Sequence, residues 1–201
     1  TSTINALTQT PVAKPAARAA IETAANNKVQ QINKSQSLTN EERTEQIAAI
    51  RQKEAAAKQA VAAQTSTQDV TSTQNAQVQA INDTPVLAFK KPAALAAIEA
   101  AEATKRQQIQ DSQMLAEEKT AALRDLDSKV QAAKDALKTA QSNQDVQNVE
   151  NNQLSQIQAV PTQSPARQTA TNEIMDAYYA RKQLISNESW LTTDEKNEKL
   201  R

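Results

Sequence analysis

Three pairs of adjacent carboxylates are the residues of this sequence whose types and spacing most suggest chemistry. They are Glu41-Glu42, Glu117-Glu118 and Asp194-Glu195. A working acid–base pair needs one carboxyl group held protonated by burial and one left ionised. Each pair instead stands where a helix is predicted to begin, and negative charge in a first helical turn complements the helix dipole. We therefore interpret the pairs as helix caps.

The composition argues against an enzyme. The 201 residues include no Gly, no Cys and no His. Without His and Cys the chain lacks the side chains that most often carry acid–base work at neutral pH, thiolate chemistry and zinc binding. Without Gly it lacks phosphate-cradling loops. We predict a non-enzymatic protein with no catalytic residue, no metal and no cofactor.

Charge and hydropathy exclude two classes of partner. Lys plus Arg and Asp plus Glu each number 23, so the formal net charge is zero, unlike the basic surface of a nucleic-acid binder. No apolar run approaches the roughly 18 residues that a membrane span needs. The apolar seams are rich in Ala and lack the aromatic and basic borders of membrane-surface helices. We expect no nucleic acid and no membrane among the partners.

The segments that carry the three carboxylate pairs are repeated along the chain. The segment from Lys14 to Glu22 (KPAARAAIE) returns from Lys91 to Glu99 (KPAALAAIE), 77 residues later. A third copy begins near Pro165. A period of this size is typical of an array of supersecondary units, which provides length or surface more often than chemistry.

Each full repeat is predicted to form three helices. The first starts at Pro15, a favourable first helical residue, and the second follows a capping box of Thr39 and Glu42. The third begins after Ser66, and its counterpart in the second repeat begins after Ser142. Short loops imply antiparallel neighbours, so the unit is expected to be a three-helix bundle.

Apolar residues at helical spacing mark the faces that pack on partner helices. In the first repeat they are Ile21, Ile32, Leu38, Ile47, Ile50, Val61, Val70 and Ile81; in the second they are Ile98, Ile109, Leu115, Leu123, Leu126, Val130, Leu137, Val146, Leu154 and Ile157.

The predicted fold is all-α: tandem three-helix bundles of about 77 residues per repeat, stacked into an elongated rod. Residues 1–9 are assigned to the third helix of a preceding repeat, with Ile4 corresponding to Ile81. Residues 10–83 form repeat 1, residues 84–160 repeat 2, and residues 161–201 the start of repeat 3, with its first helix and part of its second. Both ends cut the pattern, which favours a piece of a longer array.

The joints between repeats carry paired prolines. Pro85 and Pro92 flank one joint, and Pro11 and Pro15 stand in the matching segment before repeat 1. Because two nearby prolines break a continuous helix and stiffen the chain, we expect a semi-rigid joint. Phe89 is expected to wedge two bundles together.

The remaining aromatic residues have two interpretations. Tyr178, Tyr179 and Trp190 could form a recognition patch, since such side chains dominate binding interfaces. Packing at the base of the third bundle is the favoured interpretation.

The order of these motifs resembles a known tandem repeat. The residues that carry the resemblance are Pro15–Glu22, Leu38–Arg43, Asp69-Val70 and Ile81, and in the second copy Pro92–Glu99, Leu115–Lys119, Asp145-Val146 and Ile157. The pattern is similar to the domain of unknown function 1542 family, found in large cell-wall-anchored surface proteins of Gram-positive bacteria. The resemblance implies an extracellular helical stalk, and it carries over no catalytic or ligand-binding residue.

The function expected from these observations is a structural stalk or spacer of a bacterial cell-surface adhesin, which projects a distal adhesive domain from the cell wall. Its partners are then the neighbouring repeats of the same chain. The alternative is a helical module that binds a host matrix or serum protein or self-associates with like stalks in a biofilm. A disordered protein that folds on drying is a third interpretation, but the regular seams and capping boxes argue against it.

Overall fold

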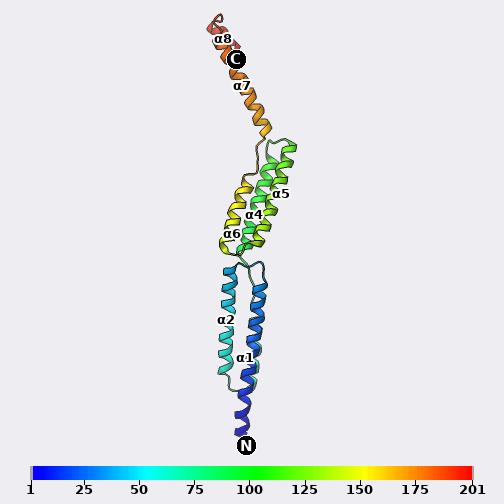
Figure 1. Cartoon of the computed structure of the whole chain (residues 1–201), viewed down its shortest axis with the longest axis vertical. Helices are drawn as coiled ribbons and strands as arrows, with labels where there is room; N and C mark the ends of the chain where they lie inside the picture. Colours follow the sequence, from blue (N-terminus) through cyan, green and yellow to red (C-terminus); the bar gives the residue numbers. More distant parts are fainter. Residues whose placement is uncertain (1, 201) are drawn as a thin grey trace. The chain divides into compact units, whose positions relative to one another are not determined.

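The computed structural model describes the backbone of residues 2–200 and the side chains of residues 13–200. The correspondence expected for Ile4 and the placement of Arg201 in a helix lie outside these residues. Within them the chain forms eight helices and no strand (Figure 1), which confirms the predicted all-α class. The helices are α1 (Ser2–Lys34), α2 (Asn40–Ala63), α3 (Thr67–Asn82), α4 (Lys90–Asp111), α5 (Ala116–Thr139), α6 (Asn143–Gln158), α7 (Pro165–Asn187) and α8 (Thr193–Lys199).

The first three helices pack on one another as a three-helix bundle. Its core is formed by the predicted seam residues together with small alanines: Ala17, Ile21, Ala24, Ala25, Ile32, Leu38, Ile50, Ala57, Val61, Val70 and Ile81 are all buried. Alanine allows helices to approach closely, so a few isoleucines suffice to fill the space between them.

Helices α4, α5 and α6 also contact one another, through ion pairs and hydrogen bonds that each lie within one compact unit. By its internal contacts the chain divides into two compact units, Thr1–Ala100 with Val130–Ser155, and Ala101–Lys129 with Gln156–Arg201, and the division runs through these three helices. In the first unit Lys134 of α5 lies 3.5 Å from Glu99 of α4. In the second, Arg106 of α4 pairs with Asp127 of α5, and Lys105 donates to the carbonyl of Gln158 at the end of α6.

The start of α1 differs from the prediction. We expected a helix beginning at Pro15 and a break at the two prolines, but α1 runs without interruption from Ser2 to Lys34. A proline within a helix removes one backbone donor and crowds the carbonyl four residues earlier. Since Pro11 and Pro15 are four residues apart, both defects fall on one side of the helix, and the alanine-rich sequence after Pro15 continues it.

The segment after α3 takes the place of a missing helical stretch. The helix α3 has 16 residues whereas α2 has 24, and residues 83–89, here called the strap, follow α3 alongside α2. Lys53 of α2 donates to Thr84 of the strap, and Gln46 of α2 donates to the carbonyl of Leu87. Val86 and Ala88 pack against the core of the bundle, so the strap is a structural part of it.

Candidate functional site: the joints between repeats

The predicted caps lie where the sequence places them. Glu41 and Glu42 occupy the first turn of α2, Glu117 and Glu118 that of α5, and Asp194 and Glu195 that of α8. The capping box of Thr39 and Glu42 is complete, and Thr192 and Glu195 form another. The capping interpretation of these glutamates is therefore confirmed.

Glu42 also caps a second helix, which the sequence analysis did not anticipate. Its Oε2 accepts the backbone N–H of Thr39 at 3.0 Å, within its own cap. Its Oε1 accepts the backbone N–H groups of Phe89 at 2.8 Å and of Lys90 at 3.0 Å, where α4 begins. One carboxylate thus satisfies unpaired donors at the start of two helices, one from each repeat.

The environment of Glu42 favours its ionised form. The residue is 7% exposed. Burial by itself raises the pKa of this carboxyl, but hydrogen bonds from the backbone of Thr39, Lys90 and Phe89 and from the Thr39 hydroxyl outweigh it, so that the pKa lies below its ordinary value of 4.5. A carboxylate that accepts several backbone N–H bonds behaves in this way.

Further hydrogen bonds hold the same joint together. The N–H of Asn40 donates to the carbonyl of Gln141 at 2.7 Å. The hydroxyl of Thr39 bonds the side chain of Asn143 at 2.7 Å, and the N–H of Asn143 donates to Glu41 at 3.0 Å. The loop before α2 therefore meets the loop between α5 and α6, and all these residues belong to the first compact unit.

Lys91 adds a cation to this joint. Its Nζ donates to the carbonyl of Gln36 at 2.9 Å and to that of Lys138 at 3.1 Å. Burial lowers the pKa of the Lys91 ammonium, and the nearby Arg43 guanidinium lowers it further. Lys91 thus connects the loop after α1 with the end of α5.

The second joint, in the other compact unit, is built around Glu118. Its Oε2 accepts the N–H of Leu115 at 2.9 Å, and its Oε1 accepts the N–H of Ala166, in the first turn of α7, at 3.2 Å. A hydrogen bond from the Ser164 hydroxyl, then those from Leu115 and Ala166, hold the pKa of Glu118 below its ordinary value. In both joints the glutamate and the N–H group of the next helix are 48 residues apart.

Comparison with known families shows that the segments on either side of the first joint are two copies of one repeat. The sequence pattern of the family described as Domain of Unknown Function (DUF1542) matches residues 13–88 and again residues 90–164. The chain belongs to the DUF1542 family. No curated protein and no solved structure matches the chain.

The boundary between the two DUF1542 copies coincides with the double cap. The first match ends at residue 88 and the second begins at residue 90, and these positions flank the N–H groups of Phe89 and Lys90 that Glu42 accepts. The second match ends at residue 164, next to the first turn of α7 that Glu118 caps. We call Glu42 and Glu118, each with its two sets of N–H donors, the joint clamps.

A basic residue follows each of the capping glutamates Glu42, Glu118 and Glu195 and closes the loop before it. Arg43 donates to the carbonyl of Ser35, Lys119 to that of Gln110, and Lys196 to that of Ser186. Each contact ties the helix that the glutamate caps to the end of the preceding helix.

Most of the apolar residues singled out in the sequence lie in the cores. Buried ones are Ile21, Ile32, Leu38, Ile50, Val61, Val70, Ile81, Ile98, Ile109, Leu126, Val130, Leu137, Val146 and Ile157. Ile47, Pro85, Pro92, Leu123 and Leu154 are half-buried or at the surface, Pro15 is exposed, and Thr39 and Glu42 are buried in the joint.

Two expectations about exposed side chains are wrong. Phe89 is 63% exposed, so its side chain does not wedge the two bundles together; its backbone N–H, which donates to Glu42, makes the contact at the joint. Tyr178, Tyr179 and Trp190 are exposed rather than packed at the base of a bundle. The two tyrosine rings contact each other edge to face, with centroids 5.4 Å apart.

Leu115 is also exposed. It stands at the position that Thr39 occupies in the first DUF1542 copy, directly before the second helix, so its backbone is used for capping while its side chain meets solvent.

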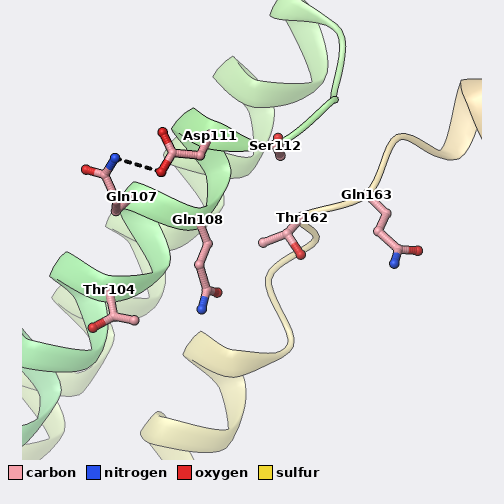
Figure 2. Close-up of a pocket in the computed structure, with 7 residues that line it drawn as sticks. All are labelled: Thr104, Gln107, Gln108, Asp111, Ser112, Thr162 and Gln163. Carbon is pink, nitrogen blue, oxygen red and sulfur yellow. Dashed lines mark hydrogen bonds between the residues drawn. The ribbon is translucent and has the colours of Figure 1, made fainter.

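The second unit has a shallow hollow on its surface (Figure 2). Residues of α4 and of the segment after α6 line it: Thr104, Gln107, Gln108, Asp111, Ser112, Thr162 and Gln163. Asp111 is the one ionisable group among them, and it accepts a hydrogen bond from Gln107 at 2.8 Å. A single carboxylate without a paired acid or base does not make a catalytic centre.

The side chains described are those of residues 13–200. Among these side chains, no group of three or more His, Cys, Asp or Glu residues lies close enough together to hold a metal ion. Of the helices described, none has the length and apolar character needed to cross a membrane.

Proposed function

We propose that this DUF1542 chain is part of a non-enzymatic stalk of a bacterial cell-surface adhesin, where it holds a distal adhesive domain away from the cell wall. The observation that carries the proposal is the recurrence of the joint clamp: Glu42 and Glu118 each bind the first helix of the following repeat. A spacer requires stiff joints, because the end-to-end distance of a flexible chain grows only with the square root of its length.

The directions of the pKa shifts support a structural role. Hydrogen bonds lower the pKa of Glu42, Glu118 and Glu195, against a burial contribution that raises it. These carboxylates therefore stay charged at neutral pH, whereas a general acid needs a raised pKa. Their charge complements the helix termini they cap.

Small-angle X-ray scattering tests the spacer. Bundles stacked end to end, with helices rising 1.5 Å per residue, would extend to about 100 Å and give a radius of gyration near 30 Å. A compact globule of this length would give about 17 Å. A value near 17 Å would mean that the repeats fold back on one another, and the spacer would be abandoned.

The location of the parent protein is part of the same proposal. We propose that the repeats lie outside the cell, anchored to the cell wall, because the resemblance is to repeats of wall-anchored surface proteins. Antibodies raised against residues 1–201 should label intact cells of the source organism. Labelling only after cell lysis would contradict an extracellular stalk.

One observation favours the alternative, a module that binds a host protein or self-associates. The helix α7 exposes several large apolar side chains: Ile174, Met175, Tyr178, Tyr179 and Leu184. Exposed apolar patches of this kind mark interaction surfaces in many proteins. Sedimentation velocity over a hundredfold range of concentration distinguishes the two, since a spacer remains a monomer and a self-associating module shifts to faster-sedimenting species.

A further inference from the structure

The joint clamps depend on the charge of one carboxylate each. Four hydrogen bonds converge on Glu42: two from Thr39 and one each from the N–H groups of Phe89 and Lys90. Glu42 and Thr39 are buried, and the hydrogen bonds from Phe89 and Lys90 are partly buried, so water replaces the carboxylate poorly as an acceptor at this joint. Buried N–H groups that lose their acceptor are costly.

Other charged groups surround the clamp without replacing it. Those on the elements packed around Glu42 are Glu41 and Arg43 of α2, Lys90 and Lys91 of α4, Lys138 of α5, Asp145 of α6 and Asp83 of the strap. Arg43 donates hydrogen bonds to the Asn40 side chain and to the carbonyl of Ser35. Lys91 donates to the carbonyls of Gln36 and Lys138. Around Glu118 they are Glu117, Lys119, Asp111 and Arg167, and the charge of Arg167 favours the ionised carboxylate.

Protonation changes a clamp from an acceptor to a donor. A carboxylate accepts on both oxygens, whereas a carboxylic acid carries a proton on one of them. Whichever oxygen of Glu42 binds the proton, it then faces N–H groups that also need an acceptor. The protonated side chain can serve the cap of α2 or the start of α4, but not both.

We propose that the joints are proton-sensitive hinges: acid protonates Glu42 and Glu118, the first helix of the following repeat is released from each clamp, and the joint becomes flexible while the bundles on either side stay folded. This inference rests on the proposed spacer function, of which it describes the regulation. The apolar cluster of the bundle of α1, α2 and α3 consists of side chains that do not titrate, so protonation of Glu42 leaves that cluster packed.

The direction of the effect follows from linkage. A group with a folded-state pKa below its unfolded-state value contributes stability that is present above the unfolded pKa and is lost as the pH falls through the folded pKa. The pKa of Glu42 lies below 4.5. The joint therefore stays closed through neutral and mildly acidic conditions and opens only below that value.

Distance measurement between spin labels tests the hinge. The chain contains no Cys, so labels attach only to introduced ones. A joint pair uses Ala49→Cys in α2 with Ala132→Cys in α5, and a bundle pair uses Ala49→Cys with Ala76→Cys in α3; all three alanines are exposed. Double electron–electron resonance is recorded on the full chain from about pH 7 down to the lowest pH at which the bundle pair stays narrow, because the pKa of Glu42 is lowered from its ordinary value.

We expect the joint pair to give a narrow distance distribution at neutral pH that broadens at least twofold in acid, while the bundle pair stays narrow. Glu42→Gln should broaden the joint pair already at neutral pH and abolish the pH transition, because an amide cannot accept on both sides. Asp69→Asn, which alters the carboxylate that accepts from the Ser66 hydroxyl in the cap of α3, is the matched control and should keep both the narrow distribution and the transition.

The outcomes separate the two proposals. A broad joint distribution at neutral pH in the unmodified chain would contradict the stiff spacer itself. A joint pair that stays narrow in acid would leave the spacer intact and overturn the hinge. Joint and bundle pairs that broaden at the same pH would also overturn it, since the acid would then unfold the bundle.

Discussion

At the scale of single residues, the joint depends on glutamate at one position of the second helix. In a capping box the third helical residue folds back on its own N-cap. Glu42 does this with one oxygen and presents the other to the start of α4. The two oxygens of one carboxylate thus link structures that are 48 residues apart. Neither the composition of the chain nor its pattern of charges indicates such a clamp.

The first prediction concerns this residue. Glu42→Gln should lower the free energy of unfolding by roughly 1–3 kcal/mol, because the amide keeps the shape but turns an NH₂ group toward buried N–H donors. Urea denaturation followed by circular dichroism measures the change. Glu45→Gln, at an exposed position of the same helix, should stay within about 0.5 kcal/mol of the unmodified chain. Equal effects of both substitutions would contradict the clamp.

The second prediction concerns a buried charge in the first bundle. Glu54 is buried and pairs with Arg51 at 2.7 Å and Lys58 at 2.6 Å. The second repeat has Val130 at this position, since Ile50 and Leu126 occupy the preceding core site in each copy. Glu54→Val should therefore be neutral or stabilising by about 1 kcal/mol, as replacement of buried ion pairs by apolar residues often is.

The pH dependence of the same variant provides a second measurement. Burial raises the pKa of Glu54, but the hydrogen bonds and charges of Lys58 and Arg51 outweigh it and leave the pKa below 4.5. The contribution of Glu54 to stability is thus present above 4.5 and lost in stronger acid, and Glu54→Val should remove that loss. A variant that loses several kcal/mol at neutral pH would show that the ion pairs matter more than the burial.

At the scale of elements, the sequence predicted those features that depend on local pattern. Helical spacing located Ile50, Val61 and Val70 in the core, and the spacing of Thr39 and Glu42 located a cap. The clamp could not be predicted, because its donors are backbone N–H groups, which leave no trace in side-chain types. The only available signal was the constant separation between each glutamate and the following first helix.

Proline was the other source of error at this scale. The prediction treated Pro15 as a first helical residue, where its missing N–H costs nothing. In the structure Pro15 lies inside α1, where a missing bond and a steric conflict do cost stability. Composition alone does not tell whether Pro15 begins a helix or lies inside one, because that depends on whether the residues before Pro15 are themselves helical.

The third prediction distinguishes them. Pro15→Ala should stabilise the chain by up to about 3 kcal/mol, because it restores a donor to the carbonyl of Pro11 and its side chain is exposed. Thermal and urea unfolding measure the change. If the helix begins at Pro15, the substitution should instead be neutral or slightly destabilising, since proline is favourable at a first helical position.

The fourth prediction restores a cap. Leu115 stands directly before α5, and Glu118 already accepts its N–H. Leu115→Thr should complete a capping box like that of Thr39 and raise the free energy of unfolding by about 0.5–1 kcal/mol. Leu115→Ala is the matched control, since it removes the same exposed side chain without supplying a hydroxyl. The loop before α5 (residues 112–115) is one residue shorter than the loop before α2 (residues 35–39), and equal stability of the two variants would mean that this shorter loop prevents the cap.

At the scale of the whole molecule, the matched DUF1542 copies and the segment after them differ in how completely their apolar side chains are covered. Ile98 is 0% exposed and lies between α4 and its neighbours, whereas Ile174, at the corresponding position of α7, is 68% exposed. The short helix α8 packs on α7, and Glu118 of α5 caps the first turn of α7. In repeat arrays, stability is approximately the sum of each unit and its interfaces, so the segment after Pro165 should be the least stable.

The fifth prediction is a gradient of hydrogen exchange. We expect amides of α7 and α8 to exchange at least a hundredfold faster than those of α1 and α2, because local opening there exposes little additional apolar surface. Exchange measured by mass spectrometry on the full chain resolves the segments. Protection of α7 equal to that of α4 at low protein concentration would contradict the prediction. Protection that appears only as concentration rises would show that a second copy covers the exposed face, and it would favour the self-associating module over the plain spacer.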